Sequence, residues 1–273
     1  LAMLIMRGLL PRLRPGAATA CLAFAFAMLS AADSFAQSVD EDFALKAALE
    51  TRLAYVVTGD PTTDDTSLQG LVGLSRILNQ RTAIEAAEPI GIDIETDPLS
   101  LFPLLYWPVT ETQQPASTET IGRLNRFMAS GGTILFDLLD GGGGGNGARL
   151  LRRLTRGLDI PPLTPVPPSH VLTKAFYLMQ SFPGRWADGR VWVERPGERV
   201  NDGVSSIIVG ANNWAAAWAV DNKGRHLFAA VPGGERQREL AYRFGVNLVM
   251  FTLTGNYKSD QVHVPSILER LGN

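Results

Sequence analysis

Short apolar runs alternate with longer amphipathic stretches along most of this chain. The runs at 53–57, 133–136 and 205–209 are brief, apolar and bounded by turn residues, which predicts buried strands. Residues 67–80 and 117–129 repeat apolar side chains every three or four positions, which predicts helices with one apolar face. This alternation of strand and helix favours an α/β fold, with a mainly parallel sheet and helices on both faces.

The remaining pattern predicts further elements and two connecting regions. Strands are expected at 90–93, 102–107, 190–194, 214–219 and 226–231, and helices at 148–157 and 236–253. Pro103 lies near the start of the strand at 102–107 and Pro108 follows it, and they favour an irregular or edge position because proline cannot donate to a strand ladder. Residues 161–168 are expected to be a proline-rich connector, and the tail at 255–273 a loop with a short helix.

The N-terminal 37 residues have a different character. Three arginines before position 15 precede an almost wholly apolar stretch at 17–32, and residues 34–36 resemble a small-residue cleavage site. This pattern predicts a hydrophobic helix at 1–37 that is a signal peptide or a membrane anchor, because the arginines stay on the cytoplasmic side. A buried N-terminal helix is the alternative. We therefore expect a protein secreted to the periplasm or associated with the inner membrane, in which residues 38–52 link the N-terminal segment to a periplasmic domain at 53–273.

Composition argues against several classes of function. The 25 basic and 27 acidic residues leave a net charge of −2, which does not favour nucleic acid as a partner. The single cysteine, Cys21, lies in the N-terminal apolar stretch, so the domain has no thiolate nucleophile and no cysteine-rich zinc site. No serine lies in a G-x-S-x-G motif, and the glycine run at 141–145 lacks the Lys-Ser/Thr of a phosphate-binding loop. We expect no recognisable catalytic apparatus and no cofactor.

Polar residues follow several of the predicted strands. Asp60 follows the first strand, Asp137 the strand at 133–136, and Asn212 and Asn213 the strand at 205–209, while Trp107 ends the strand at 102–107. Open α/β sheets bind ligands in a crevice beyond the carboxyl ends of their strands, so these five residues are the predicted ligand site. The alternative is that the aspartates and asparagines serve in turns and helix caps, roles that suit both residue types.

An acidic cluster next to this region raises the question of a metal. Asp60, Asp64 and Asp65 are close enough in sequence to hold a hard cation through oxygen ligands. Their spacing does not match an EF-hand loop, so a solvated capping loop is favoured and no metal is expected.

Four segments carry a resemblance to a known family. They are residues 55–60, 104–107, 127–137 and the stretch from 245 to 263, which includes Asn247. On these segments the chain from Leu53 onward resembles the domain-of-unknown-function family DUF4159. The resemblance implies a flavodoxin-like, class I glutamine-amidotransferase-like architecture, and a place in the C-terminal part of BatA-like alphaproteobacterial membrane proteins. It implies no biochemical activity. The polar residues at 256–263 are expected to be a structural clasp that satisfies backbone groups, with an interaction surface as the alternative.

Taken together, the sequence favours a non-catalytic periplasmic binding or interaction domain of a membrane-associated envelope protein, with a protein partner in the envelope. Two alternatives use the same strand-end crevice, namely a small-ligand or carbohydrate binder and an unusual hydrolase. A hydrolase predicts a deep pocket with a strongly shifted carboxyl or histidine, whereas a binder predicts aromatic walls without such a pair.

Overall fold

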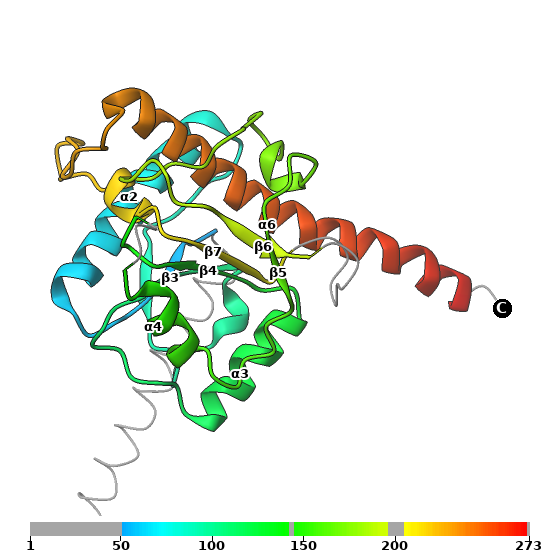
Figure 1. Cartoon of the computed structure of the whole chain (residues 1–273). Helices are drawn as coiled ribbons and strands as arrows, with labels where there is room; N and C mark the ends of the chain where they lie inside the picture. The colour runs from blue at the N-terminus through cyan, green and yellow to red at the C-terminus, as the bar shows by residue number, and fades with distance from the viewer. Residues whose placement is uncertain (1–50, 142–144, 196–204, 272–273) are drawn as a thin grey trace, which may run out of the picture. The chain divides into compact units, whose positions relative to one another are not determined.

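The computed structural model describes residues 51–141, 145–195 and 205–271, with side chains as far as Thr254 (Figure 1). These residues form a sheet of order β2-β1-β3-β4-β7-β6-β5. The first five strands in this order, β2, β1, β3, β4 and β7, pair in parallel. The last two, β6 and β5, add an antiparallel edge. The prediction of an α/β fold with a mainly parallel sheet is confirmed. The strand bounds are β1 (Ala54–Val56), β2 (Ile90–Ile92), β3 (Leu104–Pro108), β4 (Thr133–Asp137), β5 (Leu163–Pro165), β6 (Trp192–Glu194) and β7 (Ile207–Gly210).

Helices cover both faces of the sheet, as a parallel sheet buried on both sides requires (Figure 1). The helices α2, α5 and α6 contact one another on one face, whereas α3 and α4 lie on the other. Trp214, Trp218 and Phe244 fill the space between the first group and the sheet. The helix bounds are α2 (Pro61–Arg81), α3 (Thr118–Ala129), α4 (Gly147–Leu154), α5 (Trp214–Trp218) and α6 (Gly234–Leu271), with short 3-10 turns η1 (Leu99–Leu101) and η2 (Val171–Thr173).

The helix α2 packs unusually close to α5 because it presents glycine where the two backbones meet. A Cβ atom added at Gly70 would lie 2.5 Å from the carbonyl oxygen of Ala215, and one at Gly73 would lie 2.0 Å from that of Trp218. Any side chain at these positions would push α5 away from α2. This contact sets the position of α5 and of the residues just before it.

Two predicted strands are wrong. Residues 214–218 form α5, because a run of alanine between two tryptophans is buried all round and carries no strand periodicity. The side chain of Asn213 caps this helix by accepting a hydrogen bond from the backbone of Ala216. Residues 226–231 form no strand and make only isolated bridges, from His226 to Val220 and from Val231 to Trp186.

Other boundaries and positions also differ from expectation. The strand β3 lies in the sheet between β1 and β4, because Pro108 only closes it and Pro103 precedes it. The helix α2 begins at Pro61 rather than near residue 67, since Asp60 is its cap. The predicted connector at 161–168 contains the edge strand β5, and α6 continues to Leu271 where a loop with a short helix was expected.

Several predictions lie outside the described residues. They concern the segment at 1–37, the linker as far as residue 50, the glycines at 142–144 and the side chains of the expected clasp at 256–263. Within the part of the chain that the structure describes, no helix combines the length and the apolar character that crossing a membrane requires.

Candidate functional site

A crevice of about 180 Å³ lies beyond the carboxyl ends of β3 and β4. The chain runs from β1 to β2 on one side and then to β3 on the other, and open α/β sheets bind ligands at such a reversal of strand order. We call this cavity the strand-end crevice. Its lining residues are Thr62, Thr63, Thr66, Ser67, Tyr106, Pro108, Leu139, Arg185, Asn213, Ala215, Ala216 and Phe228.

The carboxylate of Asp137 organises this crevice from beneath. Asp137 is fully buried, and its Oδ2 atom accepts hydrogen bonds from the Tyr106 hydroxyl at 3.0 Å and the Trp214 backbone at 2.7 Å. Its Oδ1 atom accepts from the backbone of Asn213 at 3.0 Å and of Leu139 at 3.3 Å. Burial raises the pKa of Asp137 to about 6, against the lowering effect of the hydrogen bonds it accepts. Each oxygen therefore already serves two donors within the protein.

Two residues with a left-handed backbone line the crevice, and Asp137 accepts a hydrogen bond from the backbone of each. Leu139 and Asn213 have φ values of 65° and 51°, and among the described residues they are the non-glycine positions with a left-handed backbone. Asparagine adopts this conformation readily, whereas for leucine it costs on the order of 1–2 kcal/mol. Such strain is typical of sites where the surrounding structure imposes a backbone geometry for function.

The positive charge of Arg185 lies in the crevice wall without an acidic partner in the described part of the chain. Its guanidinium carbon lies 4.8 Å from the ring centroid of Trp186 and 5.1 Å from that of Phe228. Its Nε atom is buried and has no hydrogen-bond partner. The crevice therefore has one wall with an uncompensated cation held between two aromatic rings.

The five predicted site residues have different positions around the crevice. Asn213 lines it, and Asp137 lies beneath it. Asp60 caps α2 through Thr62, next to the crevice but not in its lining. The buried amide of Asn212 donates to the carbonyls of Phe182 and Gly189 at 2.9 Å, which fixes the loop that carries Arg185.

The remaining predicted residue, Trp107, lies on the other face of the sheet from Tyr106, because successive strand residues point to opposite faces. It packs against Phe136 with ring centroids 5.2 Å apart and does not line the crevice. Sequence analysis missed Arg185, Leu139 and Phe228, which reach the site from loops. A sequence signal for Arg185 does exist. This cation stands between a turn residue, Gly184, and an aromatic residue, Trp186.

The family described as "Domain of unknown function (DUF4159)" matches residues 52–253. The chain belongs to the DUF4159 family. This range contains every strand of the described sheet and all the residues of the strand-end crevice. A comparison with the curated proteins found no match.

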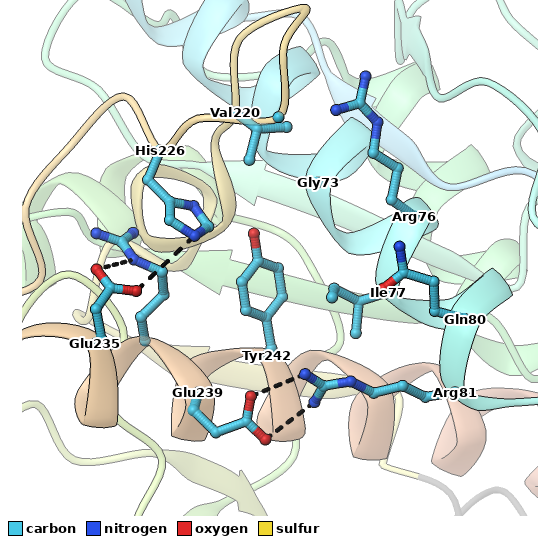
Figure 2. A pocket seen from close by; sticks show the side chains of 12 residues that line it. Gly73, Arg76, Ile77, Gln80, Arg81, Val220, His226, Glu235, Glu239 and Tyr242 are labelled. Carbon is cyan, nitrogen blue, oxygen red and sulfur yellow. Dashed lines mark hydrogen bonds and ion pairs between the residues drawn. The ribbon is translucent and has the colours of Figure 1, made fainter.

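A second and larger cavity of about 380 Å³ lies between α2 and α6 (Figure 2). Figure 2 shows Tyr242 at its centre, with paired Arg81 and Glu239 on one side and His226 near Glu235 on another. Arg81 and Glu239 form two hydrogen bonds of 2.9 and 3.0 Å. Most charged groups that line this cavity thus compensate one another, so it indicates a ligand less clearly than the strand-end crevice does.

The acidic cluster at the start of α2 serves the protein itself. Asp64 accepts hydrogen bonds from the backbone and hydroxyl of Thr58 and from the backbone of Gly59. Asp60 accepts from the backbone of Thr62 and from the hydroxyl of Thr63. Across the described ranges, no three His, Cys, Asp or Glu side chains are grouped so that they could hold a metal ion.

The residue Asn247, in the motif that carries the family resemblance, is buried and holds a loop in place through its side-chain hydrogen bonds. Its Oδ1 atom accepts from the backbones of Phe176 and Tyr177, and its Nδ2 atom donates to the carbonyls of Leu172 and Tyr177. The loop fixed in this way presents Phe176 and Leu178 to solvent, with 44% and 87% of their surface exposed. The DUF4159 domain therefore holds an apolar surface in a defined shape beside α6.

Proposed function

We propose that this DUF4159 domain is a non-catalytic binding domain of a membrane-associated envelope protein, located in the periplasm, and that its strand-end crevice holds a small ligand. The observation that carries this proposal is the state of Asp137, the acidic group of the crevice. Both of its oxygens are occupied by four donors of the protein. It positions the walls of a site and has no free lone pair directed at a bound molecule.

The same observation argues against the hydrolase alternative. A pKa of about 6 is a value that a general acid or base can use. A catalytic carboxyl must also reach the proton that it transfers, and Asp137 is fully buried and saturated with hydrogen bonds. A ligand-binding role needs only the ordered walls that Asp137 supports.

The architecture is consistent with this proposal. Counted in chain order, the five parallel strands have the order 2-1-3-4-5, which is the flavodoxin-like doubly wound arrangement. This order supports the proposed flavodoxin-like, class I glutamine-amidotransferase-like architecture. We also propose that the domain is the C-terminal part of a BatA-like membrane protein, with residues 1–37 as signal peptide or anchor.

A protein partner in the envelope is the second candidate, and one specific observation favours it. Val171, Phe176 and Leu178 are exposed apolar side chains on the segment that Asn247 clasps. Exposed apolar side chains gathered on one fixed segment are characteristic of interaction surfaces. The strand-end crevice and this apolar surface serve one function if a ligand in the crevice controls the binding of the protein partner to the surface.

Ligand capture from a periplasmic extract tests the proposal. The full chain in mild detergent is incubated with the extract and washed, and the retained small molecules are identified by mass spectrometry. A Thr66→Phe variant adds bulk in the crevice lining, whereas Thr118→Phe makes the same change at an exposed position near the start of α3. We expect wild type and Thr118→Phe to retain the same compounds and Thr66→Phe to lose them. Equal retention by all three, or none by wild type, would refute the crevice as a ligand site.

Localisation has its own test. Alkaline phosphatase fused after Asn273 becomes active only where disulfides form, outside the cytoplasm. We expect activity from the full chain and none after removal of residues 1–37. An inactive fusion of the full chain would contradict the periplasmic assignment.

A further inference from the structure

We infer that the ligand of the strand-end crevice is a small anion, a carboxylate or phosphate, that also carries a hydroxyl group, and that Arg185 binds its charge. The inference rests on the proposed function, since it names the class of ligand that the same crevice holds. Three sets of contacts carry it, and they concern charge, donors and acceptors.

Arg185 provides a positive charge in the lining of the strand-end crevice. A partly buried guanidinium without an acidic partner is unfavourable, because part of its hydration is lost and nothing replaces it. The rings of Trp186 and Phe228 attract the cation but cannot accept its in-plane N–H groups. Arg185 lines the crevice, and its guanidinium makes no hydrogen bond or ion pair with the described residues. An anion in the crevice supplies the missing charge and accepts from the terminal N–H groups of the guanidinium.

A second donor lies beside it. The Oδ1 atom of Asn213 accepts from the backbone of Ala216 at 3.4 Å, which orients the amide group. The Nδ2 atom makes no hydrogen bond within the described residues and remains available as a donor. A hydrogen bond of 3.3 Å from the backbone nitrogen of Arg185 to the carbonyl of Asn213 joins the two segments. Two donors are therefore held together on one wall.

Hydroxyl groups of α2 also line the crevice, and two of them already donate their protons within the helix. The hydroxyl of Thr66 donates to the carbonyl of Thr62 at 2.7 Å, and that of Ser67 donates to the carbonyl of Thr63 at 2.8 Å. The hydroxyl of Tyr106 donates to Asp137. The partly exposed hydroxyl oxygen of Thr66 can still accept, so a ligand that carries a donor gains a hydrogen bond there. A hydroxyl group next to the anionic group provides this donor.

The size of the crevice limits the ligand further. Its volume of about 180 Å³ is below the roughly 300 Å³ at which pockets for drug-sized molecules begin. It therefore suits a short hydroxy acid or a glycerol phosphate rather than a nucleotide. The negative charge of Asp137 does not exclude such an anion, because four donors already face that carboxylate.

Calorimetric titration of the full chain in a phosphate-free buffer tests the inference with four probes. Glycerate and glycerol 3-phosphate carry both an anionic group and hydroxyls, inorganic phosphate presents the anion alone, and glycerol presents hydroxyls alone. We expect glycerate or glycerol 3-phosphate to bind, inorganic phosphate to bind more weakly and glycerol not to bind. Whichever of the first two binds more tightly identifies the anion as a carboxylate or a phosphate.

Arginine variants locate the site. Arg185→Gln should weaken binding by about tenfold or more, since it removes a charge-assisted hydrogen bond. Arg156→Gln removes the same charge from an exposed position at the other side of the sheet and should change nothing. If Arg185→Gln does not fold, Arg185→Lys keeps the charge but not the planar fork, and should bind less tightly than wild type.

Three results would overturn the inference. They are no binding of either hydroxylated anion, equal binding by wild type and Arg185→Gln, and glycerol binding as tightly as glycerate. The proposed function fails separately, in the capture experiment. If wild type but not Thr66→Phe retained a compound without an acidic group, the crevice would remain a ligand site while the anion inference failed.

Discussion

The hydroxyl of Tyr106 on β3 donates a hydrogen bond of 3.0 Å to the carboxylate of Asp137 at the end of β4. This bond joins two adjacent parallel strands just below the strand-end crevice. Through Asp137 it connects to the backbones of Leu139 and Asn213, which both line the crevice. The shape of the crevice therefore depends on a buried carboxylate, and pH should affect it.

Replacing Asp137 with Asn should remove one component of the pH dependence of stability. The pKa of Asp137 is about 6 in the folded protein and 3.8 ordinarily, so the folded state binds the proton more tightly between these values. The contribution of this group to the free energy of unfolding therefore falls as pH rises from about 4 to about 6, by on the order of 3 kcal/mol. Urea unfolding of both proteins measures it.

The comparison between the two proteins isolates this effect from other carboxylates. The stability advantage of wild type over Asp137→Asn should be largest near pH 4 and should decline to a constant value above about pH 6. A difference that is independent of pH, or that increases with pH, would show that Asp137 does not hold its proton more tightly in the folded state.

Asn247→Ala should release the loop at 172–178 and destabilise the domain. The change leaves two backbone N–H groups and two carbonyls without their partner, and unsatisfied buried groups cost about 1–3 kcal/mol each before water reaches them. We expect a loss of about 3 kcal/mol or more in urea unfolding. Amide hydrogen exchange at Phe176 and Tyr177 should accelerate. Thr254→Ala, at an exposed position on the same helix, should do neither.

Replacement by alanine should have opposite effects on the stability of the domain at two glycines, Gly73 and Gly122. Gly73→Ala places a Cβ atom 2.0 Å from the carbonyl oxygen of Trp218, so α2 and α5 must separate, and we expect a loss of about 1–3 kcal/mol. Gly122→Ala on α3 meets nothing closer than 3.6 Å and should stabilise the fold by about 0.4–1 kcal/mol. Thermal unfolding of the two variants measures both signs. A stabilised Gly73→Ala variant would contradict the close contact of α2 with α5.

The ion pair between Arg81 and Glu239 should contribute little to stability. Its side chains are 29% and 38% exposed, so Glu239→Gln should lower the free energy of unfolding by no more than about 1 kcal/mol. The hydrogen bond from Arg81 lowers the pKa of Glu239, so the contribution is present at neutral pH and is lost as pH falls through that pKa.

Unfolding at low and high salt measures this contribution, which high salt should reduce. Glu85→Gln is the control, because Glu85 is exposed and makes no ion pair within the described residues. A loss well above 1 kcal/mol for Glu239→Gln, or one that salt does not change, would show that the pair is shielded from solvent.

Sequence periodicity identified the α/β class and most of the parallel strands, because buried strands and amphipathic helices have distinct apolar spacing. It misassigned the segment from Trp214 to Trp218, since a helix that is buried all round carries no such spacing. It also favoured an irregular or edge position for β3, because proline composition does not reveal which strands lie beside it.

The sequence by itself determined which polar residues follow the strands, and these lie at or near the carboxyl ends, as the geometry of parallel strands requires. Only the tertiary structure decided their roles. Asp137 and Asn212 became supports because backbone donors and carbonyls from distant segments surround them. Arg185 became the candidate ligand residue because a loop far along the chain is fixed against the crevice. Such contacts join segments distant in sequence, so no local pattern encodes them.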